Sequence, residues 1–370
     1  VVREGGAERV ILDPNGLSER GTIALDWWDA SPDGARVAYG LSSSGDERST
    51  LRVRDVATGT DLPEAIPDTR FSSLAWTPDG DGFYYTRLPA AGSVPAGEEN
   101  YNQRVRFHQV GTDPADDPII FGAGRAPEER YGVELSPDGR WLLLTTFEGW
   151  VKSEVYLHDR RAGGGDFVPI VTGRAALYTG QILDDRLYLL TNDEAPNFRV
   201  FRIDPAYPGR EHWWEVVREG DAALQDVRAI GDRLVLAYLR DATAALRIVG
   251  GDGGGGVAVG LPGPGTVWGI TADEGGDAAY FTYSSFFDPP GIWRCDLASG
   301  AVAPVVRPAN APDTAGLITE QVWYGSADGT RVPMFVIRRA DLPRDGQRPT
   351  VLTGYGGFNI ALSPGFHGDY

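Results

Sequence analysis

The sequence predicts a mainly β fold, a seven-bladed β-propeller whose first blade is incomplete, and three observations lead to that prediction. One turn-and-strand unit recurs along most of the chain, its repeat length stays in the forties for most copies, and helical periodicity is scarce. A period of this length with about four strands per unit is typical of a β-propeller. A β-sandwich would not repeat at a fixed period.

The repeating unit is a turn that contains Asp and usually Gly, followed by a short apolar strand. The clearest copies read "SPDGARVAYG" from Ser31, "TPDGDGFYYT" from Thr77 and "SPDGRWLLLTT" from Ser136. With three weaker copies, the aligned aspartates are Asp33, Asp79, Asp138, Asp185, Asp232 and Asp277, spaced by 46, 59, 47, 47 and 45 residues. The long second interval contains "RLPAAGSVPAGEENYNQ", which we interpret as an inserted surface loop.

The repeated Asp and Gly residues have a structural explanation. In "PDG" the proline occupies the turn position where φ is already fixed, and the glycine occupies a position that needs positive φ. The aspartate side chain is expected to accept hydrogen bonds from the turn amides. We therefore interpret these aspartates as turn residues rather than as catalytic carboxylates.

Residues 1–16, "VVREGGAERVILDPNG", resemble the closing part of a repeat such as "DLASGAVAPVVRPAN" from Asp296. This similarity predicts that a blade begins before Val1, which makes seven blades with the first incomplete. We assign residues 1–312 to the propeller.

The pattern changes after residue 312. "ITEQVWYGS" and "VPMFVIRR" alternate as strands on either side of the turn "ADGT", and the apolar stretch "RPTVLTGYGG" follows. A hairpin that leads into a buried strand is how the sheet of an α/β-hydrolase domain begins. We therefore predict that residues 313–370 are the first strands of such a domain.

Composition excludes several classes of protein. The net charge of −18 argues against a nucleic-acid partner, because phosphate binding needs a basic face. Cys295 is the only cysteine, so neither an internal disulfide nor a cysteine-rich metal site is expected. No apolar run approaches the roughly 18 residues of a membrane helix. The first residue is Val1 rather than Met, so a cytoplasmic and a periplasmic location both stay open.

Several stretches together resemble one known family. They are "AWTPDGDGFYYT", "RFHQVGTDP", "FTYSSFFDPPGI", "DGTRVPMFVIRR" and, most specifically, "GYGGFN". On these stretches, which extend over essentially the whole chain, the sequence is similar to the prolyl oligopeptidase family. These are serine peptidases with a seven-bladed propeller over an α/β-hydrolase domain.

The resemblance implies roles for the residues of "GYGGFN". Tyr355 matches a tyrosine whose phenol donates a hydrogen bond to the oxyanion of the tetrahedral intermediate. Phe358 matches an aromatic residue that packs against the proline of the substrate. Gly356 and Gly357 let the backbone turn and the substrate approach, and Asn359 is expected to fix the loop by side-chain hydrogen bonds.

The resemblance implies a serine endopeptidase that hydrolyses short peptides on the carboxyl side of proline. It implies no metal or cofactor, and it implies a monomer that needs the remaining hydrolase portion as its partner. A Gly-x-Ser-x-Gly nucleophile motif is absent, and none of the four histidines stands in a matching context, so the catalytic triad is expected outside these residues. Two alternatives stay open: a related oligopeptidase with another specificity, and a non-catalytic propeller that binds peptides.

Overall fold

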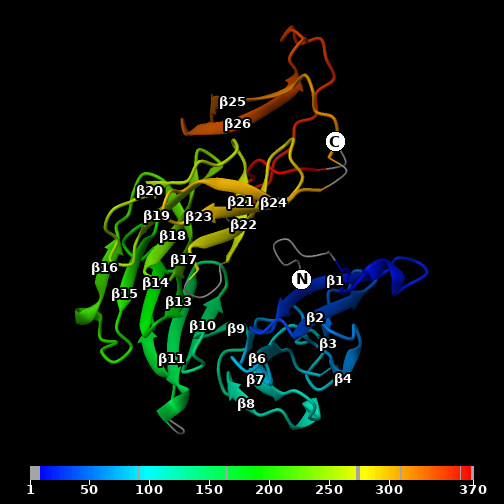
Figure 1. Cartoon of the computed structure of the whole chain (residues 1–370), viewed down its shortest axis with the longest axis vertical. Helices are drawn as coiled ribbons and strands as arrows, with labels where there is room; N and C mark the ends of the chain where they lie inside the picture. The colour runs from blue at the N-terminus through cyan, green and yellow to red at the C-terminus, as the bar shows by residue number, and fades with distance from the viewer. Residues whose placement is uncertain are drawn as a thin grey trace. The chain divides into compact units, whose positions relative to one another are not determined.

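Six four-stranded β-sheets make up most of the chain in the computed structural model (Figure 1). The structure describes residues 9–90, 92–162, 166–271, 276–308, 311–358 and 360–367. In each sheet the strands lie side by side in chain order, as in a propeller blade. The prediction of a mainly β propeller fold is therefore confirmed.

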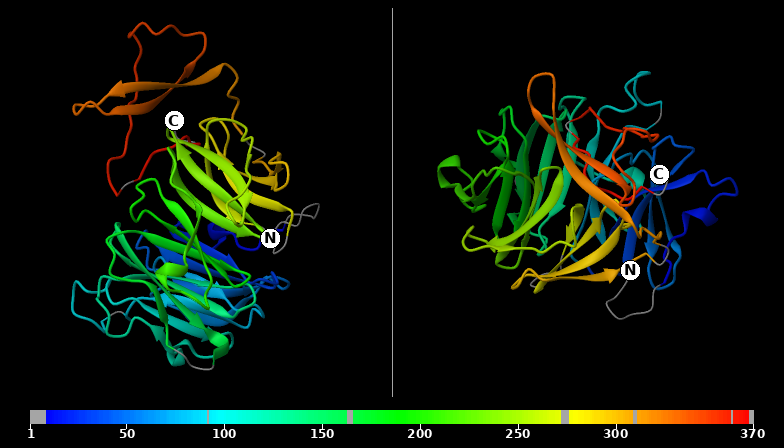
Figure 2. Two further views of the ribbon diagram at one scale, coloured as in Figure 1. Left: turned by 90° about the vertical axis from the view of Figure 1, so that its left-hand side faces the viewer. Right: turned by 90° about the horizontal axis from the view of Figure 1, so that it is seen from above.

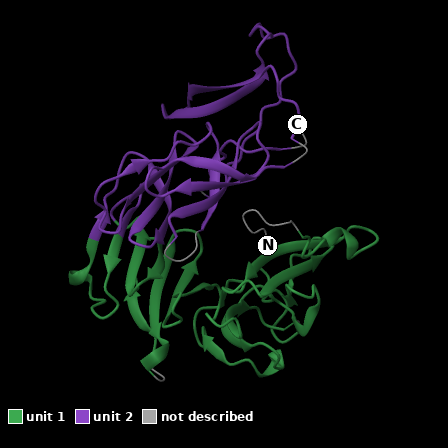
Figure 3. Cartoon of the chain, viewed as in Figure 1, with its two compact units in different colours: residues 1–193, 201–214 green, residues 194–200, 215–370 purple. Residues whose placement is uncertain are grey.

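The chain divides into two compact units, residues 1–193 with 201–214 and residues 194–200 with 215–370 (Figure 3). The first unit contains the sheets β1 (Ile23–Ala30), β2 (Arg36–Ser43), β3 (Thr50–Asp55), β4 (Asp61–Ile66); β5 (Leu74–Trp76), β6 (Gly82–Arg87), β7 (Arg104–Gln109), β8 (Ile119–Phe121); and β9 (Arg130–Leu135), β10 (Trp141–Glu148), β11 (Lys152–Asp159), β12 (Val168–Val171). A further sheet has residues of both units and consists of β13 (Tyr178–Leu183), β14 (Arg186–Thr191), β15 (Arg199–Ile203) and β16 (Trp214–Val217).

The second unit contains two complete sheets and a two-stranded hairpin. The sheets are β17 (Ala223–Ile230), β18 (Arg233–Arg240), β19 (Thr243–Gly250), β20 (Val257–Ala258); and β21 (Thr266–Thr271), β22 (Ala278–Ser284), β23 (Gly291–Asp296), β24 (Val302–Val306). The hairpin pairs β25 (Leu317–Gly325) with β26 (Arg331–Arg339) in antiparallel register. Figure 2 shows it, in orange, as a two-stranded ribbon.

Successive sheets within a unit pack on each other through apolar cores. In the first unit Leu51 of β3 lies in one buried cluster with Phe83 of β6. In the second unit Val235 of β18 lies in one buried cluster with Phe281 of β22. The second strands of these sheets, such as β6 and β10, are buried along most of their length, so both of their faces are covered. A single repeat cannot bury such a strand alone.

Three of the six turn aspartates accept hydrogen bonds within their turns as predicted, whereas Asp185 accepts bonds from the Arg140 and Trp141 side chains. Asp138 Oδ1 accepts hydrogen bonds from the hydroxyl of Ser136 at 2.7 Å and from the amide of Arg140 at 3.1 Å. Asp33 and Asp79 accept the equivalent pair of bonds in the two preceding copies. Their carboxylates are committed to closing the turns, so the structural interpretation of these residues is confirmed.

The prediction of seven blades is wrong for the described residues, which form six. The incomplete blade was expected at residues 1–16, but residues 9–16 contain only the 3-10 turn Pro14–Gly16. The carbonyl of Ile11 accepts a hydrogen bond at 2.7 Å from the Arg54 guanidinium rather than from a neighbouring strand. None of the described residues 9–16 pairs with a strand, and an apolar segment without a partner does not become a strand.

The predicted first strands of an α/β-hydrolase domain are not evident among the described residues, which form only a two-stranded hairpin in this region. The hairpin is formed, and its turn is closed by a 2.8 Å bond from the Ser326 amide to the Thr330 carbonyl. The third strand, predicted at "RPTVLTGYGG", is absent, because none of the described residues 350–358 pairs with a strand. Val351 and Leu352 are exposed instead of buried, and with no sheet edge beside them their backbone has no ladder to join.

Candidate functional site

The "GYGGFN" segment forms an exposed loop. Tyr355 is 54% exposed and Phe358 is 59% exposed. Phe358 has a φ of 57°, a left-handed backbone conformation that is uncommon for an aromatic residue and that turns the chain at this point. A hydrogen bond of 3.1 Å from the Ile360 amide to the Gly357 carbonyl closes the turn. Asn359 lies outside the described residues.

The two glycines next to Tyr355 have space around them. A Cβ atom added at Gly357 would lie 3.7 Å from the Tyr355 ring and hydroxyl, and one added at Gly356 would meet nothing within 4 Å. The positive φ of this turn occurs at Phe358 rather than at either glycine. The short loop therefore carries a phenol donor and an aromatic ring three residues apart, and both side chains are more than half exposed.

The chain beyond this loop is anchored to the sheet β21–β24. The Thr266 hydroxyl donates a 2.8 Å hydrogen bond to the carbonyl of Pro364, which is buried. The Phe366 amide donates a 3.0 Å hydrogen bond to the hydroxyl of Ser284. Neither Thr266 nor Ser284 was identified from the sequence, and no local pattern marks them, because each bonds to a residue more than 80 positions away.

The β25–β26 hairpin also contacts the sheets of its own unit. The rings of Phe286, in the β22–β23 connection, and Phe335, in β26, lie 5.4 Å apart in an edge-to-face arrangement. The Gln321 side-chain amide donates a hydrogen bond to the carbonyl of Asp241, in the β18–β19 turn. The hairpin therefore touches the turns that follow the second strand of two successive sheets.

One histidine forms a buried carboxylate pair that superficially resembles part of a catalytic triad. The Nδ1 atom of His108 lies 2.9 Å from Asp117 Oδ1, and the hydroxyl of Tyr85 donates a 2.8 Å bond to Asp117 Oδ2. His108 is fully buried, and burial and the neighbouring carboxylate raise the pKa of Tyr85 well above its usual value. The third member of the group is a tyrosine held neutral rather than a serine, so the arrangement is structural.

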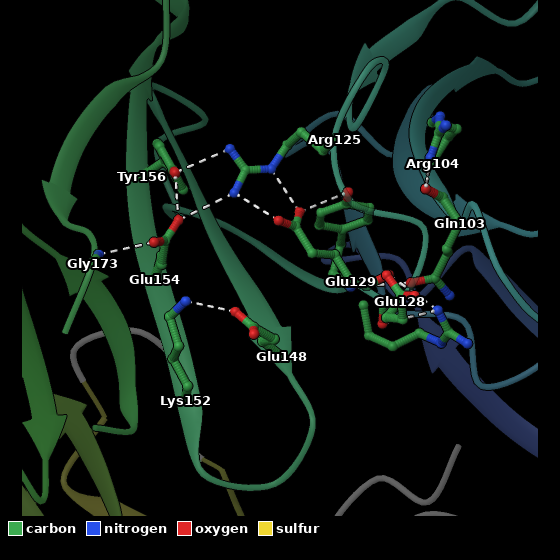
Figure 4. Close-up of polar contacts among 12 residues, drawn as sticks. Gln103, Arg104, Arg125, Glu128, Glu129, Glu148, Lys152, Glu154, Tyr156 and Gly173 are labelled. Carbon is green, nitrogen blue, oxygen red and sulfur yellow. Dashed lines mark hydrogen bonds and ion pairs between the residues drawn. The ribbon is translucent and has the colours of Figure 1, made fainter. Parts of the chain in front are cut away.

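A second polar cluster surrounds Arg125 in the connection between β8 and β9 (Figure 4). Its guanidinium donates hydrogen bonds to Glu129 at 2.6 Å, to Glu154 at 3.1 Å and to the Tyr156 hydroxyl at 3.1 Å. The Gly173 amide donates a 2.9 Å bond to the other oxygen of Glu154. The cluster ties the connection to strand β11.

The electrostatics of this cluster are those of a closed network. Burial alone would raise the pKa of Glu154, but the bonds from Tyr156, Gly173 and Arg125 outweigh it, and the pKa is lowered. Lys152 pairs with Glu148 beside it at 2.5 Å. Because the carboxylates are already engaged by arginine, lysine and hydroxyl donors, we assign the cluster a role in stability rather than in ligand binding.

The described residues contain neither a cluster of metal-binding side chains nor a membrane-spanning helix. No three His, Cys, Asp or Glu side chains in the part of the chain that the structure describes come together as a possible metal site. Within the same residues, no helix has both the length and the apolar character needed to cross a bilayer.

Comparison with known proteins agrees with the fold. The family model described as "Prolyl oligopeptidase, N-terminal beta-propeller domain" matches residues 1–308. The prolyl endopeptidase of Elizabethkingia meningoseptica is 31% identical over 364 residues, which cover 98% of this chain and 51% of that protein. Prolyl oligopeptidase A of Amanita bisporigera is 28% identical over 386 residues, covering 96% of this chain and 50% of that protein.

Solved structures give the same result. One comes from a study of two prolyl endopeptidases and of inter-domain dynamics in their catalysis and specificity; it matches with a TM-score of 0.92 and 37% identity, over 99% of this chain and 54% of that one. Prolyl oligopeptidase B of Galerina marginata, bound to a 35mer hydrolysis and macrocyclization substrate, matches with a TM-score of 0.86 and 27% identity, over 96% and 52%.

This chain spans about half the length of the relatives it matches. Three findings lead to one assignment: the repeated four-stranded sheets, the family model that matches residues 1–308, and the structural match over nearly the whole chain. The chain belongs to the prolyl oligopeptidase family, and it contains that family's N-terminal β-propeller domain.

Proposed function

We propose that this chain is part of a serine endopeptidase that cleaves short peptides on the carboxyl side of proline. In this proposal residues 1–312 are a propeller domain that restricts access, and residues 313–370 begin the catalytic domain. Short proline-containing peptides are the ligands, and the complete protein acts as a monomer with no metal or cofactor. The names of the relatives support the activity, since several are called prolyl endopeptidases or prolyl oligopeptidases.

The observation that carries the proposal is the exposed loop with Tyr355 and Phe358 three residues apart. When a peptide is cleaved after proline, the carbonyl that becomes the oxyanion and the pyrrolidine ring belong to the same substrate residue. A donor for the oxyanion and an apolar face for the ring are therefore needed close together. A loop that presents a phenol and a phenyl ring within four residues meets that requirement.

The proposed reaction is acyl transfer. A serine outside residues 1–370 attacks the prolyl carbonyl while a histidine accepts its proton, and the Tyr355 phenol donates a hydrogen bond to the resulting oxyanion. Collapse of the intermediate releases the amine with the proton returned by histidine, and water then hydrolyses the acyl-enzyme. The role of Tyr355 is to stabilise charge that exists only in the transition state, so it should affect kcat more than KM.

The test uses the full polypeptide, a serine-directed fluorophosphonate and chromogenic peptides with proline or alanine before the scissile bond. We expect covalent labelling, a strong preference for proline, and a fall in kcat of about 100-fold for Tyr355→Phe. Tyr324→Phe is the matched control, because Tyr324 is similarly exposed on the hairpin at 51%.

Each alternative gives a different result in this experiment. Labelling without a preference for proline would indicate a related oligopeptidase with another specificity. Binding of peptides without labelling or turnover would indicate a non-catalytic propeller. Equal activity of Tyr355→Phe and the unmodified protein would contradict the role of the phenol while leaving the peptidase activity in place.

A further inference from the structure

We propose that Thr266 and Ser284, two hydroxyl residues of the last four-stranded sheet, are positioning residues that hold the Tyr355 loop in its working place. The inference rests on the proposed function for its catalytic consequence. Its structural part, that these hydroxyls anchor the loop, can be tested independently of any activity.

The two hydroxyls form hydrogen bonds, called clamps below, to the residues on either side of Gly365. Thr266 is the first residue of β21 and Ser284 is the last residue of β22, and the two are direct cross-strand partners. Thr266 donates to the carbonyl of Pro364, and Ser284 accepts from the amide of Phe366, so the bonds flank Gly365. Because one bond uses a carbonyl and the other an amide, the clamps fix the direction of the segment as well as its position.

The anchors are themselves held rigidly. Ser284 is only 2% exposed, and its hydroxyl donates a 2.9 Å hydrogen bond to the Asp288 carbonyl while it accepts from Phe366. A Cβ atom added at Gly265 would lie 2.4 Å from the Tyr283 ring and 2.5 Å from the Ser284 carbonyl. Only glycine therefore lets the chain enter β21 at this place, which puts the Thr266 hydroxyl opposite Ser284.

The clamps are close to Tyr355 along the chain. Pro364 follows Phe358 by six residues, a span of at most about 20 Å when extended. On the other side of the loop, the described residues 351–354 form no strand, and Val351 and Leu352 are exposed. The loop is thus restrained mainly from its carboxyl-terminal side, by a sheet of the propeller.

This restraint has a consequence for the proposed reaction. A hydrogen-bond donor stabilises an oxyanion only when it lies about 2.7–3.1 Å from the position of that oxygen. Loss of a clamp would allow the loop to move, so Tyr355 would meet the oxyanion less often, while contacts of the substrate with other parts of the protein would be kept. The expected sign is a lower kcat with little change in KM.

The experiment compares variants of the full polypeptide by hydrogen–deuterium exchange and by steady-state kinetics. Ser284→Ala and Thr266→Val each remove one hydroxyl, whereas Ser284→Thr and Thr266→Ser retain it. We expect the first two to raise amide exchange in residues 351–366 several-fold and to lower kcat about tenfold with KM within about twofold. We expect the two conservative variants to restore both values.

Ser285→Ala is the matched control, because the Ser285 hydroxyl bonds to the Asp288 side chain rather than to the segment. Unchanged exchange in residues 351–366 for both Ser284→Ala and Thr266→Val would overturn the anchoring. Raised exchange with an unchanged kcat would overturn the positioning role. If the unmodified protein had no peptidase activity, the proposed function and the catalytic role of the clamps would fall together, while the exchange data would still decide whether the hydroxyls hold the loop.

Discussion

The sheet β21–β24 and the hairpin β25–β26 follow each other in the chain but differ in how they are stabilised. Both have antiparallel strands and alternating side chains. In the sheet, Phe281 is 1% exposed and lies in the core shared with the preceding sheet, whereas Trp323 in the hairpin is 40% exposed. Strand pairing is therefore common to both regions, and the burial of a face distinguishes them.

Within the second unit, the sheets and the hairpin therefore contribute differently to stability. The four-stranded sheets bury large apolar side chains, which contribute most of the stability of a propeller repeat. The hairpin and the loop after it keep aromatic residues exposed and touch the sheets at a few points, including Phe335 against Phe286. A two-stranded hairpin is marginal by itself, so these contacts with the sheets are needed to hold it.

The largest expected difference between the two regions concerns core truncation. Phe281→Ala should lower the free energy of unfolding of the second unit by about 3–5 kcal/mol, because it removes a buried ring and leaves a cavity between two sheets. Trp323→Ala should change the same quantity by less than about 1 kcal/mol, since its side chain is already partly in water. Urea unfolding followed by circular dichroism measures both variants. Equal losses would mean that the hairpin belongs to the same cooperative core as the sheets.

Much of the sheet architecture could be predicted because it depends on local sequence. The turn aspartates, the strands that follow them and the β25–β26 hairpin are all encoded within stretches of about ten to twenty residues. The predictions of a seventh blade and of a strand at "RPTVLTGYGG" were wrong because these features depend on residues distant in the sequence. An apolar segment becomes a strand only when a neighbouring edge is present, and residues 9–16 and 350–358 have none among the described residues.

The residues of the candidate site also differ in whether they could be predicted from local sequence. Tyr355 and Phe358 could be proposed as site residues from a short motif of six consecutive residues. Thr266 and Ser284 could not be named, because an isolated hydroxyl at the end of a strand is common and its bonding partner lies on a distant segment. The aromatic turn at Phe358 was also missed, because glycine rather than phenylalanine is the residue expected at positive φ.

A smaller effect on stability is expected when the turn aspartate is removed from a sheet or from the hairpin. Asp138 in the sheet β9–β12 and Asp328 in the hairpin each accept a bond from the amide two residues later, at 3.1 Å and 2.9 Å. Asp138→Ala should lower the free energy of unfolding of the first unit by about 1 kcal/mol, because two hydrogen bonds to a charged acceptor are lost in a turn that joins core strands. Asp328→Ala should leave global unfolding unchanged and raise amide exchange only within the hairpin. A global loss for Asp328→Ala would contradict the separation between sheet and hairpin.

The smallest effect is an electrostatic one that is confined to the hairpin. Glu320 of β25 accepts a 2.9 Å bond from Arg338 of β26 and a further bond from Arg344, and these bonds lower its pKa to about 2. Because the pKa in the folded state is below its ordinary value of 4.5, this carboxylate stabilises the hairpin above pH 4.5. That contribution is lost as the pH falls from 4.5 towards 2. Amide exchange in residues 317–339 should therefore increase over this range. Glu320→Gln should weaken the dependence and leave the part due to Asp328, whose pKa is lowered by bonds from Thr330 and Ser326. The side chain is partly exposed and its charge is screened by salt, so the core of the sheets should not respond. An equal pH response of Glu320→Gln and the unmodified chain would show that a group other than Glu320 causes it.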